Sequence, residues 1–126
     1  VTGLEDERWA GAFSGAAASA LEAWEAPGSM EGEIELPFGS FPAPVVAKIY
    51  VVEQTTHAWD LATALQAEDA LDAELATEVL PIAAEIILPE YRGEEPMPFG
   101  AIVPLPSKSP DYDRLAAFMG RRPPAA

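Results

Sequence analysis

The chain has 126 residues, of which 49% are hydrophobic, a length that fits one domain and a composition that supports a folded core. Its 21 acidic residues outnumber its 7 basic residues and give a net charge of −14, so its surface repels the phosphates of nucleic acids. It has no cysteine, which excludes disulfides, thiolate metal ligands and a thiol nucleophile supplied by the protein itself.

No apolar stretch approaches the roughly 20 residues that a membrane-spanning helix needs, and no signal peptide opens the chain. We therefore expect a cytoplasmic domain that binds neither a membrane nor nucleic acid. The first residue is Val1 rather than methionine, which leaves open an alternative start codon or a longer parent chain.

The N-terminal third predicts one helix followed by a short extended element. Apolar residues recur at steps of three and four over residues 6–26, which is typical of an amphipathic helix that Pro27 and Gly28 end. Its apolar stripe consists of Trp9, Phe13, Ala16, Ala17, Ala20, Leu21 and Trp24. Over residues 31–41 apolar and polar residues alternate, which predicts a strand, and Pro37 favours a sheet edge. With a turn at Gly39 in "FGSF", a small hairpin or an extended loop fits this segment.

A second helix is predicted over residues 45–65. The prolines of "PAPVV" suit its first turn, because the first N–H groups of a helix have no intrahelical partner. Its apolar residues occupy more than one face, so we expect it to be central and largely buried. They are Val45, Val46, Ile49, Val52, Trp59, Leu61 and Leu65.

A third helix is predicted to begin after Asp72, which suits an N-cap, and to close at residues 91–93. Pro81 and Pro89 should each kink it or end a turn.

After a proline-rich extended segment, Ser109 as N-cap and Pro110 as first residue predict a last short helix. It should bury Leu115, Phe118 and Met119 and end at Gly120. Arg121 and Arg122 follow directly, where they favour the helix dipole more readily than an anion site.

The second helix carries the candidate site. Glu53 and His57 are four residues apart, so a helix brings a carboxylate and the only imidazole of the chain to the same face. Such a pair can share a divalent metal, and Asp60, three residues further, could orient the ring or supply a third oxygen. Two ligands fall short of the usual three or four, so a structural hydrogen bond or ion pair explains the same spacing. The expected burial of this helix favours a function, because buried polar groups need partners.

Four ordered motifs support a family resemblance. The segment "VVEQTTHAWDLATAL" resembles the signature helix of the DinB-like metal-binding superfamily. The motif residues are Glu53, His57, Trp59, Asp60, Leu61 and Ala62, followed by Leu71, Asp72, Glu74 and Leu75. "EAWEAPGSMEGEIELPFGSFPA" before it and "FGAIVPLPSKSPDYDRLAAFMGRRP" after it also resemble the family pattern. The closer similarity is to actinobacterial proteins related to the N-terminal domain of mycothiol-dependent maleylpyruvate isomerase.

The resemblance implies a mainly α, DinB-like four-helix bundle, with a short β-hairpin or extended segment. It implies that Glu53 and His57 bind a divalent metal, zinc or nickel, while Trp59 and Asp60 pack and orient the signature helix. In the family a third ligand, also histidine, comes from an earlier helix. His57 is the only histidine here, and the family's first two helices are missing before Val1. We therefore expect a single domain over residues 1–126 that is N-terminally truncated and keeps the C-terminal half of the bundle.

Three functions remain open at this stage. The first is a metal-binding domain of a thiol-dependent transferase or isomerase, with mycothiol as co-substrate and a small electrophile as substrate. The second is a non-catalytic helical module that binds a partner or forms a homodimer, which the incomplete ligand set favours. The third is a degenerate relative without activity.

Overall fold

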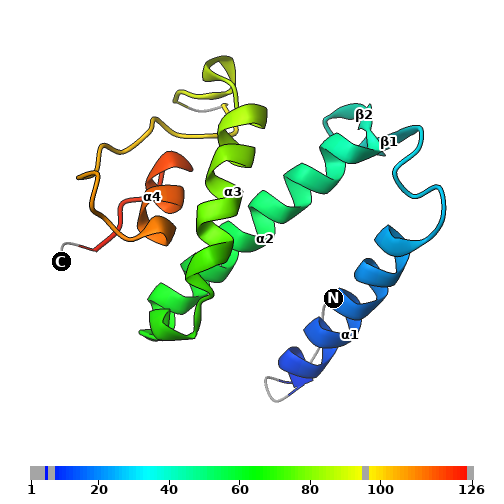
Figure 1. Ribbon diagram of the computed structural model, residues 1–126, viewed down its shortest axis with the longest axis horizontal. Coiled ribbons are helices and arrows are strands. Elements are labelled where there is room, and N and C mark those ends of the chain that lie inside the picture. Colours follow the sequence, from blue (N-terminus) through cyan, green and yellow to red (C-terminus); the bar gives the residue numbers. More distant parts are fainter. Residues whose placement is uncertain (1–4, 6–7, 95–96, 125–126) are drawn as a thin grey trace. The chain divides into compact units, whose positions relative to one another are not determined.

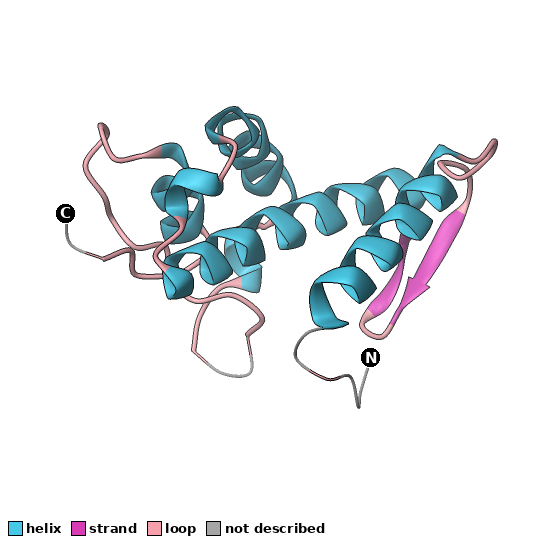
Figure 2. Ribbon diagram, turned by 90° about the horizontal axis from the view of Figure 1, so that it is seen from below, coloured by secondary structure: helices cyan, strands magenta, loops and turns pink. Residues whose placement is uncertain are grey.

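The computed structural model describes residues 5, 8–94 and 97–124. In this part of the chain it is mainly helical and contains a two-stranded antiparallel sheet (Figures 1 and 2). The predicted fold class, mainly α with a short hairpin, is therefore confirmed. The chain divides into two compact units, residues 1–44 and residues 45–126, and each is described by itself. The single domain and the bundle type stay predictions.

None of the described helices combines the length and the apolar character that a membrane crossing requires.

The N-terminal unit consists of helix α1 (Trp9–Glu25) and a hairpin of strands β1 (Glu33–Leu36) and β2 (Gly39–Pro42). The helix and its end before Pro27 agree with the prediction. No residue of α1 is buried, and Phe13 is 65% exposed. The apolar stripe of α1 is therefore not a core within this unit, whose other regular elements are two four-residue strands.

The hairpin turns earlier than the sequence predicted. Its register pairs Leu36 with Gly39, so Pro37 and Phe38 form the two-residue turn and Pro37 lies outside both strands. The fixed φ of proline suits the first position of a turn. Gly39, at φ 145°, begins β2, and a Cβ atom there would lie 3.2 Å from the Phe41 ring. Backbone conformation and space therefore both favour glycine at this position.

Helix α2 (Ala43–Leu65) is followed in the C-terminal unit by α3 (Ala73–Ile86) and α4 (Asp111–Phe118). Short 3₁₀ turns, η2 (Glu68–Ala70) and η3 (Pro89–Tyr91), follow α2 and α3. The predicted bounds of α2 are confirmed to within two residues, and Pro44 lies in its first turn, where a missing N–H costs nothing.

Helix α3 begins as predicted but ends earlier. The Asp72 carboxylate caps it by accepting a hydrogen bond from the Glu74 N–H at 3.1 Å. The helix continues through Pro81 and does not end there, while the predicted kink stays a prediction. It ends at Ile86, not at residues 91–93, because proline forces the residue before it into extended backbone, and Leu88 before Pro89 has ψ 157°.

Helix α4 begins one residue later than predicted, since Pro110 is the N-cap and Asp111 the first helical residue. Gly120 ends the turn as expected, with φ 86°. A Cβ atom on Gly120 would lie 3.2 Å from the Cα atom of Gly100, so close approach of two backbone segments also favours glycine here.

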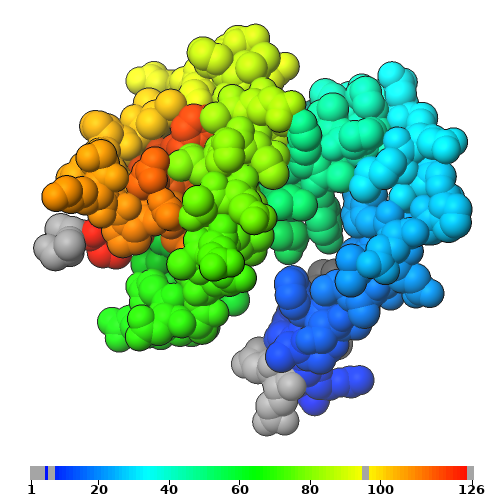
Figure 3. Space-filling view, in the orientation of Figure 1, coloured from blue at the N-terminus to red at the C-terminus, as the bar shows by residue number. Residues whose placement is uncertain are grey.

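The core of the C-terminal unit lies where α2, α3 and α4 meet. One buried cluster contains Val52, Val79, Ala83, Ile87, Leu115 and Met119, and a second contains Trp59, Ala76, Tyr112 and Ala116. In the space-filling view the atoms of α3 and α4 lie directly against one another (Figure 3). Helix α2 is less buried than the sequence predicted: Val46, Val52 and Trp59 are buried, but Leu61 and Leu65 are 62% and 66% exposed.

We predict that Leu115→Ala lowers the free energy of unfolding by about 2–5 kcal/mol, because Leu115 is fully buried and its loss leaves a cavity. Urea unfolding followed by circular dichroism measures this change. Leu61→Ala, a matched change at an exposed helical position, should stay within about 0.5 kcal/mol of the unaltered protein. Equal effects of the two variants would contradict the core assignment.

Candidate metal site

Helix α2 brings the three predicted site residues together around one imidazole ring. The Nε2 atom of His57 lies 3.4 Å from Oε2 of Glu53, and its Nδ1 atom lies 2.9 Å from Oδ2 of Asp60. The two carboxylates therefore face opposite nitrogens of the ring. Helical spacing alone explains this arrangement, because Glu53 at i−4 and Asp60 at i+3 lie on the same face as His57.

This face of α2 is exposed, contrary to the expectation from the sequence. The side chain of His57 is 60% exposed, and those of Glu53 and Asp60 are partly exposed. The buried stripe, which includes Val52, Thr56 and Trp59, lies about 100° around the helix from this face, because each of its residues directly precedes a site residue. Burial therefore gives no argument for a function of the Glu53–His57 pair, but the ring is accessible to small molecules.

Arg121 is a member of the site that sequence reasoning missed. Its Nε and Nη2 atoms donate to Oδ1 and Oδ2 of Asp60, at 3.2 and 2.9 Å, in a two-pronged ion pair. The prediction had assigned this arginine to the dipole of the last helix. The two partners are 61 residues apart, and a pairing over that distance has no local signal beyond the "GRRP" motif itself.

The end of α4 determines where Arg121 lies. The Gly120 N–H donates to the Ala117 carbonyl at 3.1 Å, and the Arg121 N–H donates to the Ala116 carbonyl at 2.9 Å. With Gly120 at positive φ, these two bonds form a Schellman motif, a common helix end that reverses the chain direction. The arginine side chain is thereby directed to α2, and its Nη1 atom also donates to the Met119 carbonyl at 3.3 Å.

The electrostatics of the site keep Asp60 ionised. Partial burial is the largest single influence and raises the pKa of the carboxyl group. The hydrogen bond from Arg121, the hydrogen bond from His57 and the charges of both residues lower it, and together they outweigh burial. The pKa of Asp60 therefore lies below its usual value of 3.8.

Trp59, the residue before Asp60, connects α2 to the first turn of α4. Its ring is 6% exposed, and its Nε1–H donates to Oδ1 of Asp113, in the first turn of α4, at 3.0 Å. Consecutive residues of α2 thus contact the beginning of α4 and the turn after its end. The roles that the family resemblance gives Trp59 and Asp60, packing and orienting the signature helix, stay predictions.

The donor set for a metal ion consists of two groups. A metal on Nε2 of His57 would be within reach of Glu53, while Asp60 lies on the far side of the ring, at Nδ1. In the described part of the chain, no group of three or more His, Cys, Asp or Glu side chains is placed to hold one ion. The residues therefore fit two coordination positions, and Asp60 fits the role of a ring-orienting carboxylate rather than a ligand.

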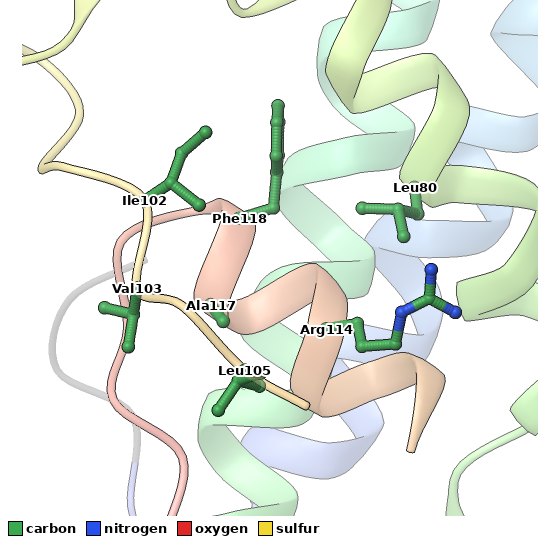
Figure 4. Close-up of a pocket in the computed structure, with 7 residues that line it drawn as sticks. All are labelled: Leu80, Ile102, Val103, Leu105, Arg114, Ala117 and Phe118. Carbon is green, nitrogen blue, oxygen red and sulfur yellow. The ribbon is translucent and has the colours of Figure 1, made fainter. Parts of the chain in front are cut away.

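A shallow apolar pocket of about 200 Å³ lies elsewhere in the C-terminal unit (Figure 4). Its lining is Leu80, Ile102, Val103, Leu105, Arg114, Ala117 and Phe118. In the close-up, Ile102 and Val103 lie on the opposite side from Leu80 and Arg114. The guanidinium of Arg114 is paired with Asp111 at 2.8 Å, and no residue of α2 lines the pocket. It is therefore separate from the site around His57.

Comparison with known proteins finds relatives in one organism. Over 110 residues the chain is 42% identical to "Uncharacterized protein MT0763" of Mycobacterium tuberculosis (strain CDC 1551 / Oshkosh) and to "Uncharacterized protein Rv0738" of Mycobacterium tuberculosis (strain ATCC 25618 / H37Rv). The match covers 87% of this chain and spans 60% of the length of each relative. No family model and no solved structure matches the chain. The DinB-like resemblance therefore stays a prediction.

We predict that Asp60→Asn destabilises the fold at neutral pH and that this difference shrinks in acid. The pKa of Asp60 is lowered on folding, so its ionised form stabilises the fold above the unfolded value of 3.8, and this contribution is lost as the pH falls through the lower folded pKa. Urea unfolding between about pH 3 and 7, with a chelator present, measures the difference.

The control for this prediction is Asp69→Asn, which removes an exposed carboxylate in η2. Its unfolding free energy should follow the pH profile of the unaltered protein. A difference for Asp60→Asn that stays constant down to about pH 3 would show that ionisation of Asp60 contributes nothing.

Proposed function

We propose that this chain is a divalent-metal-binding helical domain of DinB-like type, with Glu53 and His57 as two of the ligands. The observation that carries the proposal is the 3.4 Å separation of Nε2 and Oε2. Tetrahedral zinc holds nitrogen and oxygen donors at about 2.0–2.2 Å, which puts two such donors about 3.3–3.5 Å apart. The pair therefore has the spacing of two ligands of one ion without any movement of the helix.

The arrangement around the ring supports the same proposal. Histidine ligands of metals usually donate their second N–H to a carboxylate, and Asp60 accepts from Nδ1 on the side away from Glu53. Zinc and nickel both accept imidazole and carboxylate ligands. The described residues supply two positions, and water, a small molecule or a further protein ligand would fill the others.

The family resemblance supplies the proposed chemistry, which is thiol-dependent transfer or isomerisation of a small electrophile with mycothiol as co-substrate. When bound, a divalent ion acts as a Lewis acid that lowers the pKa of a coordinated thiol or polarises a carbonyl group. In this proposal Glu53 and His57 bind, Asp60 holds the proton on Nδ1, and Arg121 holds Asp60. A low-molecular-weight thiol is kept reduced in the cytoplasm, so the proposal places the domain there.

A second candidate function is a non-catalytic helical module that binds a partner or forms a homodimer. The observation that favours it is the exposed apolar surface of α1, where Trp9, Phe13 and Leu21 are all exposed. In this alternative the Glu53–His57–Asp60 cluster is a surface network of hydrogen bonds and ion pairs, worth about 0–1 kcal/mol for each pair. Metal binding distinguishes the two candidates.

The test is metal content by inductively coupled plasma mass spectrometry, after chelation and then dialysis against zinc or nickel. We expect close to one ion per site in the unaltered protein, and a loss of at least about tenfold in occupancy for His57→Ala and for Glu53→Gln, because each removes one of two ligands. Circular dichroism confirms that the variants are folded.

The matched control is Glu78→Gln, which makes the same change at an exposed position of another helix and should leave the metal content unchanged. Absence of metal from the unaltered protein, or equal content in His57→Ala, would contradict the metal proposal and favour the non-catalytic module.

A further inference from the structure

The Asp60 carboxylate joins Arg121 to His57. Its Oδ2 atom lies 2.9 Å from Nη2 of Arg121 and 2.9 Å from Nδ1 of His57, and its Oδ1 atom lies 3.2 Å from Nε of Arg121. A residue that follows α4 is thereby connected through one carboxylate to the ring on α2.

The donors and acceptors of this chain determine where the imidazole proton lies. A guanidinium has N–H donors only, and an ionised carboxylate has acceptors only. Each ring nitrogen of His57 faces a carboxylate, and a neutral imidazole has one N–H to donate. The shorter contact, 2.9 Å from Nδ1 to Asp60 against 3.4 Å from Nε2 to Glu53, favours the proton on Nδ1 and leaves the lone pair on Nε2.

We infer that Arg121 is a positioning residue, which holds Asp60 so that His57 keeps its proton on Nδ1 and presents the Nε2 lone pair next to Glu53. This inference rests on the proposed function, because a free Nε2 lone pair matters only if His57 binds a metal ion. Nε2 can bind an ion only when it carries no proton. Arg121 itself touches neither the ion nor a substrate. It acts through Asp60, and Asp60 acts through the ring.

The geometry explains why an arginine suits this position. Two N–H groups of one planar guanidinium hold both oxygens of Asp60, which fixes the plane of the carboxylate as well as its place. Without them the carboxylate can rotate away from Nδ1, and the ring can then take either tautomer. A lysine keeps the charge but lacks the planar pair of donors.

The same contacts argue against an ion on the Asp60 side of the ring. A metal on Nδ1 would have to share Asp60 with the guanidinium, which already uses both carboxylate oxygens. It would also place a divalent charge beside the positive charge of Arg121, which is unfavourable by Coulomb repulsion. Glu53 has no such competitor among its described ion pairs.

The first experiment measures the tautomer in the metal-free protein. His57 is the only histidine in the chain, so a long-range ¹H–¹⁵N correlation spectrum contains a single imidazole. The sample contains a chelator, and the pH is raised until the spectrum stops changing. We expect the unaltered protein to be protonated on Nδ1, and Arg121→Gln to shift a substantial fraction of the proton to Nε2.

Arg122→Gln is the matched control, because Arg122 is exposed and adjacent, and it should retain the spectrum of the unaltered protein. If Arg121→Gln does not fold, as judged by circular dichroism, Arg121→Lys takes its place with the same expected shift. An Nε2-protonated ring in the unaltered protein, or an unchanged tautomer in the folded Arg121 variant, would overturn the inference.

The second experiment titrates zinc into the same proteins. We expect Arg121→Gln to weaken zinc binding by about 10–100-fold, the usual effect of removing an outer partner of a metal ligand, and Arg122→Gln to leave it unchanged. Zinc that binds the unaltered protein and Arg121→Gln equally well would overturn the inference alone. Zinc that binds neither would overturn the proposed function, while the tautomer spectra would still decide the role of Arg121.

Discussion

The packing of α4 into the core that it shares with α2 and α3 is the contact on which the C-terminal unit and its site depend. Its apolar part includes Leu115, which is fully buried in one cluster with Val52 and Val79. A buried leucine contributes about 1.5–3 kcal/mol, whereas a partly exposed ion pair contributes about 0–1 kcal/mol. The core therefore provides the stability, and the polar contacts of Trp59 and Asp60 provide the direction in which α4 lies along α2.

Several basic residues of this acidic chain contact α4 or the turn that follows it. Arg92 donates to the Phe118 carbonyl at 2.7 Å and lies over the Phe118 ring, 4.3 Å from its centre. Arg114 pairs with Asp111 in the first turn of α4, and Arg121 pairs with Asp60 beyond its last turn. Three of the seven basic residues thus bind groups of α4 or hold it to its neighbour, and these three form no free surface for an anion.

Much of this arrangement could be predicted from the sequence where the cause is local. Helical periodicity gave α2 and α4 to within two residues, the Asp72 cap gave the start of α3, and the four-residue spacing brought Glu53 to His57. Exposure could not be predicted in the same way. Periodicity shows that a helix has an apolar face, but which faces are covered depends on partners elsewhere in the chain, and the exposed Leu61 is an example.

Arg121 marks the limit of that local reasoning. Its partner, Asp60, is set by the Schellman turn after α4 and by the packing of α4 on α2, neither of which can be read from "GRRP" alone. At Pro81, α3 continues although proline removes one backbone hydrogen bond, and Val79 and Ala83 on either side of it are buried in the core.

The two carboxylates beside His57 differ in how their charges are paired. Arg121 compensates the negative charge of Asp60 and donates two N–H groups to its carboxylate. The described ion pair of Glu53 is with Nε2 of His57 at 3.4 Å, beyond a good hydrogen bond, so its charge is compensated weakly. In the proposed site, a divalent ion bound to Nε2 of His57 and to Glu53 would leave the partners of Asp60 in place. It would add positive charge beside the weakly paired Glu53 carboxylate.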